Sequence, residues 1–232
     1  MSWFLRGLRA GTLTEDLRES AELPLSLSPG LPEASTFSTV EDAADIASLC
    51  PTGALNSEGC VVNVDDGRCV ECMRCKPLQS WRHDATWAHR ANGAPLDGAF
   101  KRSIHVRIVD AGDCGSCLNE LAQLNGPSYN LHRFGIFITP TPRQADVLLV
   151  VGPVTRQMLD PLKLAYEAMP TPKRVVAVGA CAASGGVFGP SVMCAAGAAS
   201  AVPVDLVVPG CPPPPLAIVH ALRTVCGQEM PE

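Results

Sequence analysis

Ala145-Asp146-Val147-Leu148-Leu149-Val150-Val151 is the stretch that decides the fold of this 232-residue chain. After Asp146 it is apolar throughout, without the alternation of polar and apolar residues that a half-exposed strand shows. A short apolar run of this kind is typical of a strand buried on both faces of a parallel sheet. We therefore predict that this stretch is a central strand of such a sheet.

Strand and helix patterns alternate on both sides of this stretch. The expected strands are His105–Val109, Gly135–Thr139, Ala145–Val151, Arg174–Val178 and Val204–Val208, and the expected helices are Leu118–Leu124, Leu159–Met169 and Leu216–Cys226. Such alternation, with glycine-rich turns at the strand ends, indicates an α/β fold with an open, mostly parallel sheet. Ligands of these sheets bind at the carboxyl ends of the strands.

Four cysteines lie in turns that follow the expected strands. They are Cys114, Cys117, Cys181 and Cys211. A C-x2-C pair alone also occurs in thioredoxin-type redox proteins, but two further cysteines that each follow a strand and a glycine favour a shared site at one sheet edge. Glycines there let the backbone approach a cluster and offer N–H groups to its sulfides. We predict that these four cysteines hold a 4Fe–4S cluster.

An earlier group of cysteines has the spacing of a ferredoxin. Cys69-Val70-Glu71-Cys72-Met73-Arg74-Cys75 is a C-x2-C-x2-C run, and Cys50-Pro51 precedes it by 19 residues. Three thiolates at this spacing bind one iron–sulfur cube, and a remote cysteine followed by proline supplies the fourth ligand. The region resembles the bacterial ferredoxins with two 4Fe–4S clusters. We therefore infer a first 4Fe–4S cluster on Cys50, Cys69, Cys72 and Cys75.

The ligand positions of the second ferredoxin cluster carry other residues. They are Val40, Ala43, Ile46 and Gln79, and the three apolar ones are expected to fill the vacated space. We therefore predict a ferredoxin-like unit with one cluster. A four-cysteine zinc site is the alternative, although three cysteines in one run plus a distant Cys-Pro is iron–sulfur spacing.

Composition and the chain start bear on partners and compartment. A net charge of −5, a pI near 5.5 and 5% aromatic residues argue against nucleic-acid binding. We find no secretory h-region and no twin arginine, so we expect a cytoplasmic chain in which clustered thiols bind metal. The uncharged stretch Val175–Val204 is broken by Gly and Pro, so we expect no membrane span. Trp3-Phe4-Leu5, beside two arginines, is expected to pack on a neighbouring subunit or on the chain's own core, with a membrane surface as the alternative.

We divide the chain into four segments: an N-terminal arm over residues 1–38, a small α+β ferredoxin-like domain over 39–80, a linker over 81–102, and the α/β domain over 103–232. Residues 20–38 of the arm are rich in Ser, Pro and Leu and are expected to be extended.

The α/β region resembles the small subunit of nickel–iron hydrogenases, specifically the energy-converting kind related to complex I. The segments that carry the resemblance are Asp110–Glu120, Leu131–Thr139, Ala145–Met158, Val175–Gly186 and Pro203–Ala221. The resemblance implies a flavodoxin-like fold, a single proximal 4Fe–4S cluster on Cys114, Cys117, Cys181 and Cys211, and a large partner subunit with a nickel–iron centre. It places neither nickel nor flavin on this chain.

The 20 kDa subunit of complex I is the other family to which this region is similar. That family typically has two adjacent cysteines where this chain has Cys114-x2-Cys117, which is the hydrogenase form. The loop after the last ligand usually reads C-P-P-R-P-E in both families, but Pro214 and Leu216 replace the Arg and Glu here. This departure puts in doubt any polar contact that the loop makes with the large subunit.

The remaining candidates have weaker signals. Glu120 is a candidate proton relay toward the partner, or else a carboxylate favoured by a helix N-terminus. We interpret Cys60, Cys194 and Cys226 as buried thiols without a ligand role.

The combined interpretation is an oxidoreductase subunit that transfers electrons, with the active centre on its partner. We expect further iron–sulfur or membrane subunits, which would hold the chain on the cytoplasmic face of the inner membrane. Two alternatives stay open: a complex I-like subunit linked to quinone or ion pumping whose large subunit lacks nickel, and a zinc-stabilised scaffold.

Overall fold

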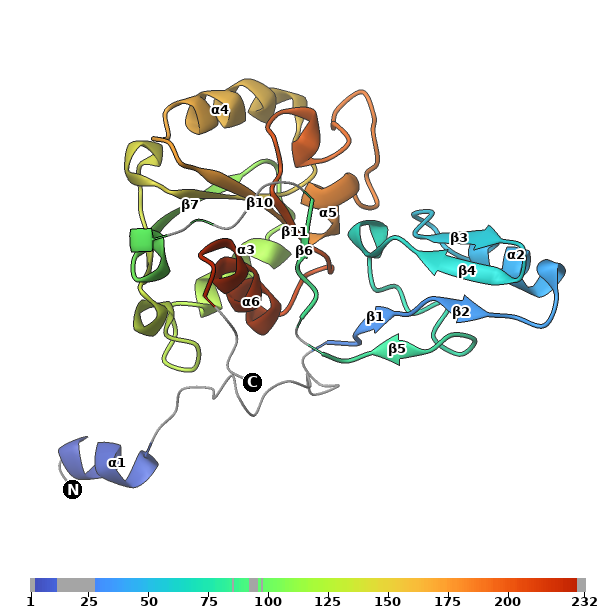
Figure 1. The fold of residues 1–232 in the computed structure, drawn as a ribbon, viewed down its shortest axis with the longest axis horizontal. Coiled ribbons are helices and arrows are strands. Elements are labelled where there is room, and N and C mark those ends of the chain that lie inside the picture. Colours follow the sequence, from blue (N-terminus) through green and yellow to red (C-terminus); the bar gives the residue numbers. More distant parts are fainter. Residues whose placement is uncertain (1–2, 12–27, 85, 92–95, 97, 229–232) are drawn as a thin grey trace.

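The computed structural model of the chain describes residues 3–11, 28–84, 86–91, 96 and 98–228. Figure 1 shows a larger part with a central sheet, a smaller part packed beside it, and helix α1 (Trp3–Ala10) lying away from both. No residue of α1 is buried. The expectation that Trp3, Phe4 and Leu5 pack on the chain's own core is therefore wrong, and the other two alternatives remain.

The larger part has the strand order of flavodoxin. In the described residues its sheet runs β6-β11-β10-β9-β7-β8, and all neighbours are parallel except β6 with β11. Numbered along the chain, the five parallel strands have the order 2-1-3-4-5, as in flavodoxin-like folds. The strands are β6 (His89–Arg90), β7 (Ile104–Asp110), β8 (Ile136–Ile138), β9 (Val147–Val151), β10 (Arg174–Val178) and β11 (Leu206–Val208). The flavodoxin-like α/β fold predicted from the sequence is confirmed.

Strand β9 is buried on both faces, as its apolar run predicts. Val147, Leu149 and Val151 point into one core with helices α3 and α6, while Leu148 and Val150 point into a second core with helix α4. The helices are α3 (Ser116–Gln123), α4 (Arg156–Glu167) and α6 (Pro215–Val225). Helices on both faces explain why a strand without alternation is stable here.

The smaller part packs one helix against a three-stranded antiparallel sheet of order β2-β4-β3. Its elements are β2 (Ser35–Thr36), α2 (Val40–Ser48), β3 (Leu55–Glu58) and β4 (Val61–Val64). Thr39 caps α2, because its Oγ1 accepts a hydrogen bond of 3.1 Å from the Asp42 amide.

Two of the three apolar residues at the expected second-cluster positions are buried. Ala43 and Ile46 are buried in the core of the smaller part. Val40 is 57% exposed at the start of α2, so the expectation is wrong for this residue, because the first turn of the helix projects into solvent. Gln79 is buried and its amide donates to the Glu33 carbonyl.

The two parts are joined by direct packing. The 3-10 turn Asp66–Arg68 lies against helix α5 (Gly179–Ser184), and the Ser184 hydroxyl donates to the Gly67 carbonyl at 3.0 Å. Leu31 and Ala54 of the smaller part belong to the same core as α3 and α6. The smaller part is thus fixed on the larger one rather than tethered to it.

The segments between the parts contain more structure than their composition indicates. Within the expected linker over 81–102, β5 (Trp81–Arg82) pairs with β1 (Leu31–Pro32), and β6 adds an edge strand to the main sheet. Residues 12–27 of the expected arm, and residues 85, 92–95 and 97 of the expected linker, lie outside the described residues. In the part of the chain that the structure describes, no helix has the length and apolar character needed to span a bilayer.

Gly152, directly after β9, gives a test of the sheet edge. Its φ is +90°, and a Cβ there would lie 2.6 Å from the Asp113 amide nitrogen. We expect Gly152→Ala to lower the free energy of unfolding by about 2 kcal/mol or more, from backbone strain plus overpacking. Gly59→Ala is the control, since φ there is +63° with open space around it, and about 1 kcal/mol is expected. Urea unfolding followed by circular dichroism measures both. Equal losses would contradict the close approach.

Candidate metal centres

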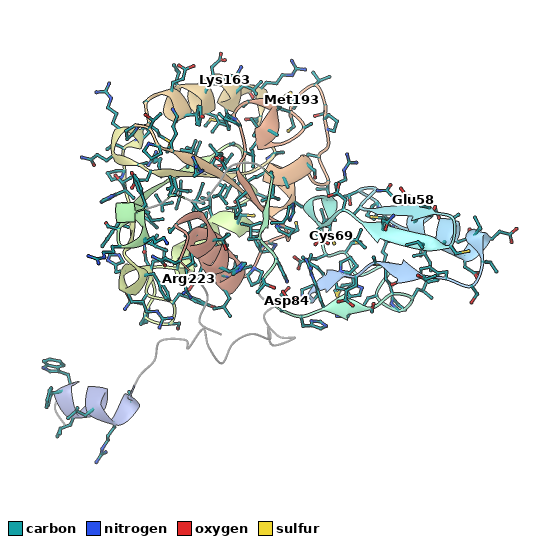
Figure 2. The ribbon with its side chains drawn as sticks, viewed as in Figure 1. Glu58, Cys69, Asp84, Lys163, Met193 and Arg223 are labelled. Atoms are coloured by element: carbon teal, nitrogen blue, oxygen red, sulfur yellow. The ribbon has the colours of Figure 1, made fainter. Side chains whose placement is uncertain are left out.

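The first set of predicted ligands surrounds one pocket. Its lining combines apolar side chains, among them Leu49, Leu55 and Trp81, with four thiols: Cys50, Cys69, Cys72 and Cys75. Cys69 lies where the two parts of the molecule meet (Figure 2). An apolar pocket ringed by four thiols has the donor set that a 4Fe–4S cluster needs, because each iron takes one thiolate.

The loop between the ligands has a strained backbone. Glu71 (φ 51°) and Met73 (φ 59°) both adopt the left-handed conformation, which costs an L-residue about 1–2 kcal/mol. Each of them lies between two cysteines of the C-x2-C-x2-C run. The left-handed residues curl the chain, so that the ligands on either side can line the same pocket. Strain of this kind is typical of functional loops.

Cys50 has the environment of a stabilised thiolate. Burial opposes ionisation of its thiol, but hydrogen bonds from the Thr52 hydroxyl and from backbone amides outweigh burial and lower its pKa. One of these amides, that of Ala54, donates to Cys50 Sγ at 3.2 Å. Backbone donors to a ligand sulfur are among the features that tune the potential of a bound cluster.

Cys69 and Cys75 are buried and have the opposite shift. Burial, with the charges of neighbouring groups including Cys50, raises the pKa of Cys69 to about 12 and also raises that of Cys75. A metal ligand must be deprotonated, so the positive charge of the metal has to compensate for this repulsion.

The second set meets at the carboxyl edge of the sheet. Cys114 precedes α3, Cys117 lies in its first turn, Cys181 lies in α5 after β10, and Cys211 follows β11. Cys181 is therefore in a short helix, not in the turn that we expected. The pKa of the Cys117 thiol is raised mainly by burial. The charges of neighbouring groups raise it further, and these are Asp113, Cys211, Cys181 and Cys114. Burial, then Cys211 and Cys114, raise the pKa of Cys181 to about 11. The four thiols are thus close enough to act on one another.

Two glycines permit this convergence. A Cβ at Gly179 would lie 2.7 Å from Cys117 Sγ, and a Cβ at Gly186 would lie 2.8 Å from Cys181 Sγ. Both residues have positive φ, at +86° and +56°. The backbone lies close to the sulfur atoms at these positions because glycine has no side chain to intervene.

Each set supplies four thiols, which is the number that a four-iron cluster requires. In the described residues, no three His, Cys, Asp or Glu side chains lie close enough together to hold a single metal ion.

The other predicted residues lie outside both sets. Glu120 is in the second turn of α3, where burial raises the pKa of its carboxyl group. Cys226 is buried, and its thiol donates to the Leu222 carbonyl at 2.8 Å. Cys60 and Cys194 are only half-buried, so our interpretation of them as buried thiols is wrong. Cys60 lies in the tight turn between β3 and β4, and Cys194 lies in a surface loop that bridges to Thr155.

Glu71 is the residue that sequence reasoning missed. Its Oε1 accepts a hydrogen bond of 2.9 Å from the amide of Cys211, so a spacer residue of the first set contacts a ligand of the second. Burial raises the pKa of its carboxyl group to about 7, although hydrogen bonds from Cys211 and Ser28 act in the other direction. The only signal in the sequence was a carboxylate placed between two ligands.

The fold and the gathered thiols define a cysteine-rich α/β protein with flavodoxin-like strand order. A family model described as NADH ubiquinone oxidoreductase, 20 kDa subunit, matches residues 114–225. A probable membrane-bound hydrogenase subunit, mbhJ of Pyrococcus furiosus, is 46% identical over 121 residues, which are 52% of this chain and 72% of the relative. The chain therefore belongs to this family, which comprises iron–sulfur electron-transfer subunits of hydrogenases and complex I.

Two further comparisons find similar chains in other oxidoreductase complexes. An NADH-quinone oxidoreductase subunit of Citrifermentans bemidjiense is 46% identical over 106 residues, which are 46% of this chain and 62% of that relative. A chain of the membrane-bound sulfane sulfur reductase, an archaeal respiratory membrane complex, is similar in structure, with a TM-score of 0.50 at 32% identity. The match covers 56% of this chain and 71% of that chain. The similarity to subunits of oxidoreductase complexes is thus confirmed for the α/β part.

Cys50 is the ligand whose assignment is easiest to test. We expect Cys50→Ser to remove or convert the N-terminal cluster, because a hydroxyl replaces the remote thiolate, and to leave the signal of the other cluster intact. Cys60→Ser is the matched control, since Cys60 does not line the pocket. Iron content and electron paramagnetic resonance (EPR) spectra of the reduced protein measure both. The reverse pattern, loss with Cys60 and retention with Cys50, would overturn the assignment.

Proposed function

We propose that this chain is the electron-transfer subunit of a nickel–iron hydrogenase complex. In this proposal, two 4Fe–4S clusters pass electrons between a donor or acceptor subunit and the nickel–iron site of a large partner subunit. The observation that carries the proposal is the placement of four cysteines at the carboxyl edge of the sheet, where the backbone at Gly179 lies against Cys117 Sγ and close to Gly210, the residue before Cys211. Cys114 and Cys117 have the spaced arrangement that resembles hydrogenases.

A bound 4Fe–4S cluster supplies one-electron chemistry. The chain's own residues bind it, exclude water and set its environment. Cys69, Cys75, Cys117 and Cys181 are buried, while Cys72 and Cys114 are exposed. Each set therefore has a buried side and an open side, which suits electron entry from one neighbour and exit to another.

The loop after α5 supports a large partner next to the second set. Phe188 is 53% exposed and Val192 is 79% exposed, and Val187 and Met193 are exposed with them. Large apolar side chains grouped on a surface are typical of protein interfaces. Cys194, the residue after Met193, lies near enough to Cys181 to affect the pKa of its thiol, so a partner that covers this loop would lie close to the second set.

The departure in the last ligand loop leaves the partner contact to other residues. Leu216 is buried in the main core, and Pro214 is the N-cap of α6. Both residues thus serve the packing of α6, and a charged contact at these positions is absent from the described residues.

The similarity to an NADH-quinone oxidoreductase subunit favours the complex I-like alternative. The zinc scaffold is the other alternative, because four thiols are also a donor set for zinc. Metal content separates these alternatives. Iron in both sets with a nickel-free partner would favour the complex I-like function, whereas a colourless zinc protein would favour the scaffold.

Metal content is the first measurement. We expect about eight irons per chain after anaerobic purification, because two four-iron clusters are proposed, with little zinc. Elemental analysis with acid-labile sulfide determination checks this. About four irons would show that one set is misassigned, and about twelve would show that the vacated ferredoxin site is filled.

Hydrogen chemistry is the second measurement. We expect the chain to co-purify with a nickel-containing large subunit and the complex to reduce viologen dye with hydrogen. Cys181→Ser should abolish this activity without disrupting the complex, because it removes a ligand of the cluster next to the partner.

Cys194→Ser is the control for that experiment, since Cys194 lies near enough to Cys181 to affect its pKa but belongs to neither ligand set. Its activity should be retained. A complex with both clusters but without nickel, inert toward hydrogen, would replace the hydrogenase proposal by the complex I-like one.

A further inference from the structure

A hydrogen bond between side chain and backbone connects the two ligand sets directly. Glu71 stands between Cys69 and Cys72 of the first set, and its Oε1 accepts from the backbone amide of Cys211 at 2.9 Å, across 140 positions of sequence. Its charge also acts on the thiols of both Cys69 and Cys211, so the carboxylate is near a ligand of each set.

The surroundings of Glu71 are shaped to hold this bond. A Cβ at Gly210 would lie 2.9 Å from Glu71 Oε1, so a larger residue there would crowd the carboxylate. The buried hydroxyl of Ser28 gives Glu71 a second hydrogen bond. The left-handed backbone of Glu71 is unfavourable for an L-residue, and placing a carboxylate among thiols adds repulsion. The backbone conformation and the charge of Glu71 are thus both locally unfavourable, and its contacts with the other part of the molecule hold it in place.

We infer that Glu71 is a positioning residue for electron transfer between the two clusters: its bond to Cys211 fixes the two ligand loops relative to each other and completes a bonded route between them. This inference deepens the proposed function and rests on it, because a cluster is required at each site.

The route runs from the Cys72 side chain through its backbone into Glu71, then across the hydrogen bond to the amide and side chain of Cys211. Electron tunnelling decays less steeply through covalent and hydrogen bonds than through empty space, so such a route favours transfer. With a cluster bound at each site, the step would move one electron from one cluster to the other, with no bond formed or broken.

The first test asks whether the bond exists in solution, and it needs no cluster. Residues 209–215 read Pro-Gly-Cys-Pro-Pro-Pro-Pro, so only Gly210 and Cys211 carry an amide hydrogen in this segment. Hydrogen exchange of peptides that cover it, measured on the full chain by mass spectrometry, therefore reports almost directly on the Cys211 amide.

We expect Glu71→Ala to speed exchange at Cys211 about tenfold, since it removes the carboxyl oxygen that accepts the hydrogen bond of this amide. Glu71→Gln should keep most of the protection, because its amide oxygen still accepts. Glu58→Ala, at an exposed glutamate of β3, is the matched control and should change nothing. Unchanged exchange in Glu71→Ala would overturn the inference.

The second test uses the full chain reconstituted with iron and sulfide and reduced with dithionite. Two reduced clusters held at a fixed spacing broaden and split each other's EPR signals. We expect this interaction to be lost or weakened in Glu71→Ala, retained in Glu71→Gln and unchanged in Glu58→Ala, with iron content equal in all four proteins. Rapid-freeze sampling after addition of reduced viologen should show slower equilibration between the clusters in Glu71→Ala alone.

The outcomes distinguish a failure of the proposed function from a failure of the role inferred for Glu71. A wild-type chain that binds one cluster or none removes the proposed function, whatever the exchange data show. A Glu71→Ala protein with both clusters, an unaltered interaction spectrum and unaltered equilibration leaves the proposed function intact and overturns the role of Glu71. A role that is only electrostatic is excluded if Glu71→Gln, which also lacks the charge, keeps the wild-type spectrum.

Discussion

The arrangement of this molecule depends on the contact between the first ligand loop and the carboxyl edge of the parallel sheet. Hydrogen bonds cross this contact from the Ser184 hydroxyl to the Gly67 carbonyl and from the Cys211 amide to Glu71. Parallel strands deliver their following loops to one edge, so the second set of cysteines has to lie there. Packing the smaller part on that same edge places the two sets side by side. A single chain thereby holds its two candidate metal centres in a fixed relation, which separate subunits would achieve only by docking.

The chemistry of the two sets follows from this burial. Thiols that are buried together resist ionisation, and the raised pKa values of Cys69 and Cys181 express that resistance. Metal binding has to displace protons from these thiols, so it couples to pH and to folding. Lower pH opposes it, because protons compete for the same sulfur atoms. Cys50 is the exception, since it receives the Ala54 amide and has a lowered pKa. Cys50, the candidate ligand far from the others in sequence, is thus a thiol whose thiolate form is favoured by the surrounding protein groups.

Much of the fold was predictable because its signals are repeated. The apolar run of β9 and the alternation around it predicted the parallel sheet, and the cysteines of the first set, which were grouped by their spacing, line one pocket. Strand β6 escaped prediction because two residues, His89 and Arg90, show no periodicity. Helix α5 escaped because six small residues after a strand look like a turn. Val40 was expected to be buried but is exposed, because its position in the cysteine motif does not determine which way the first turn of a helix faces.

Glu71 belongs to the part of the site that no local rule predicts. Helix and strand patterns report how a residue meets its neighbours in sequence, whereas the partner of Glu71 is 140 positions away. Its left-handed backbone and its carboxylate beside thiols both violate local preference, and such violations concentrate at functional sites. A negative charge also disfavours thiolates, so a carboxylate here opposes metal binding unless it contributes something else. In our inference, the hydrogen bond from the Cys211 amide to Glu71 is that contribution, because it fixes the spacing between the two ligand sets even though the carboxylate disfavours the neighbouring thiolates.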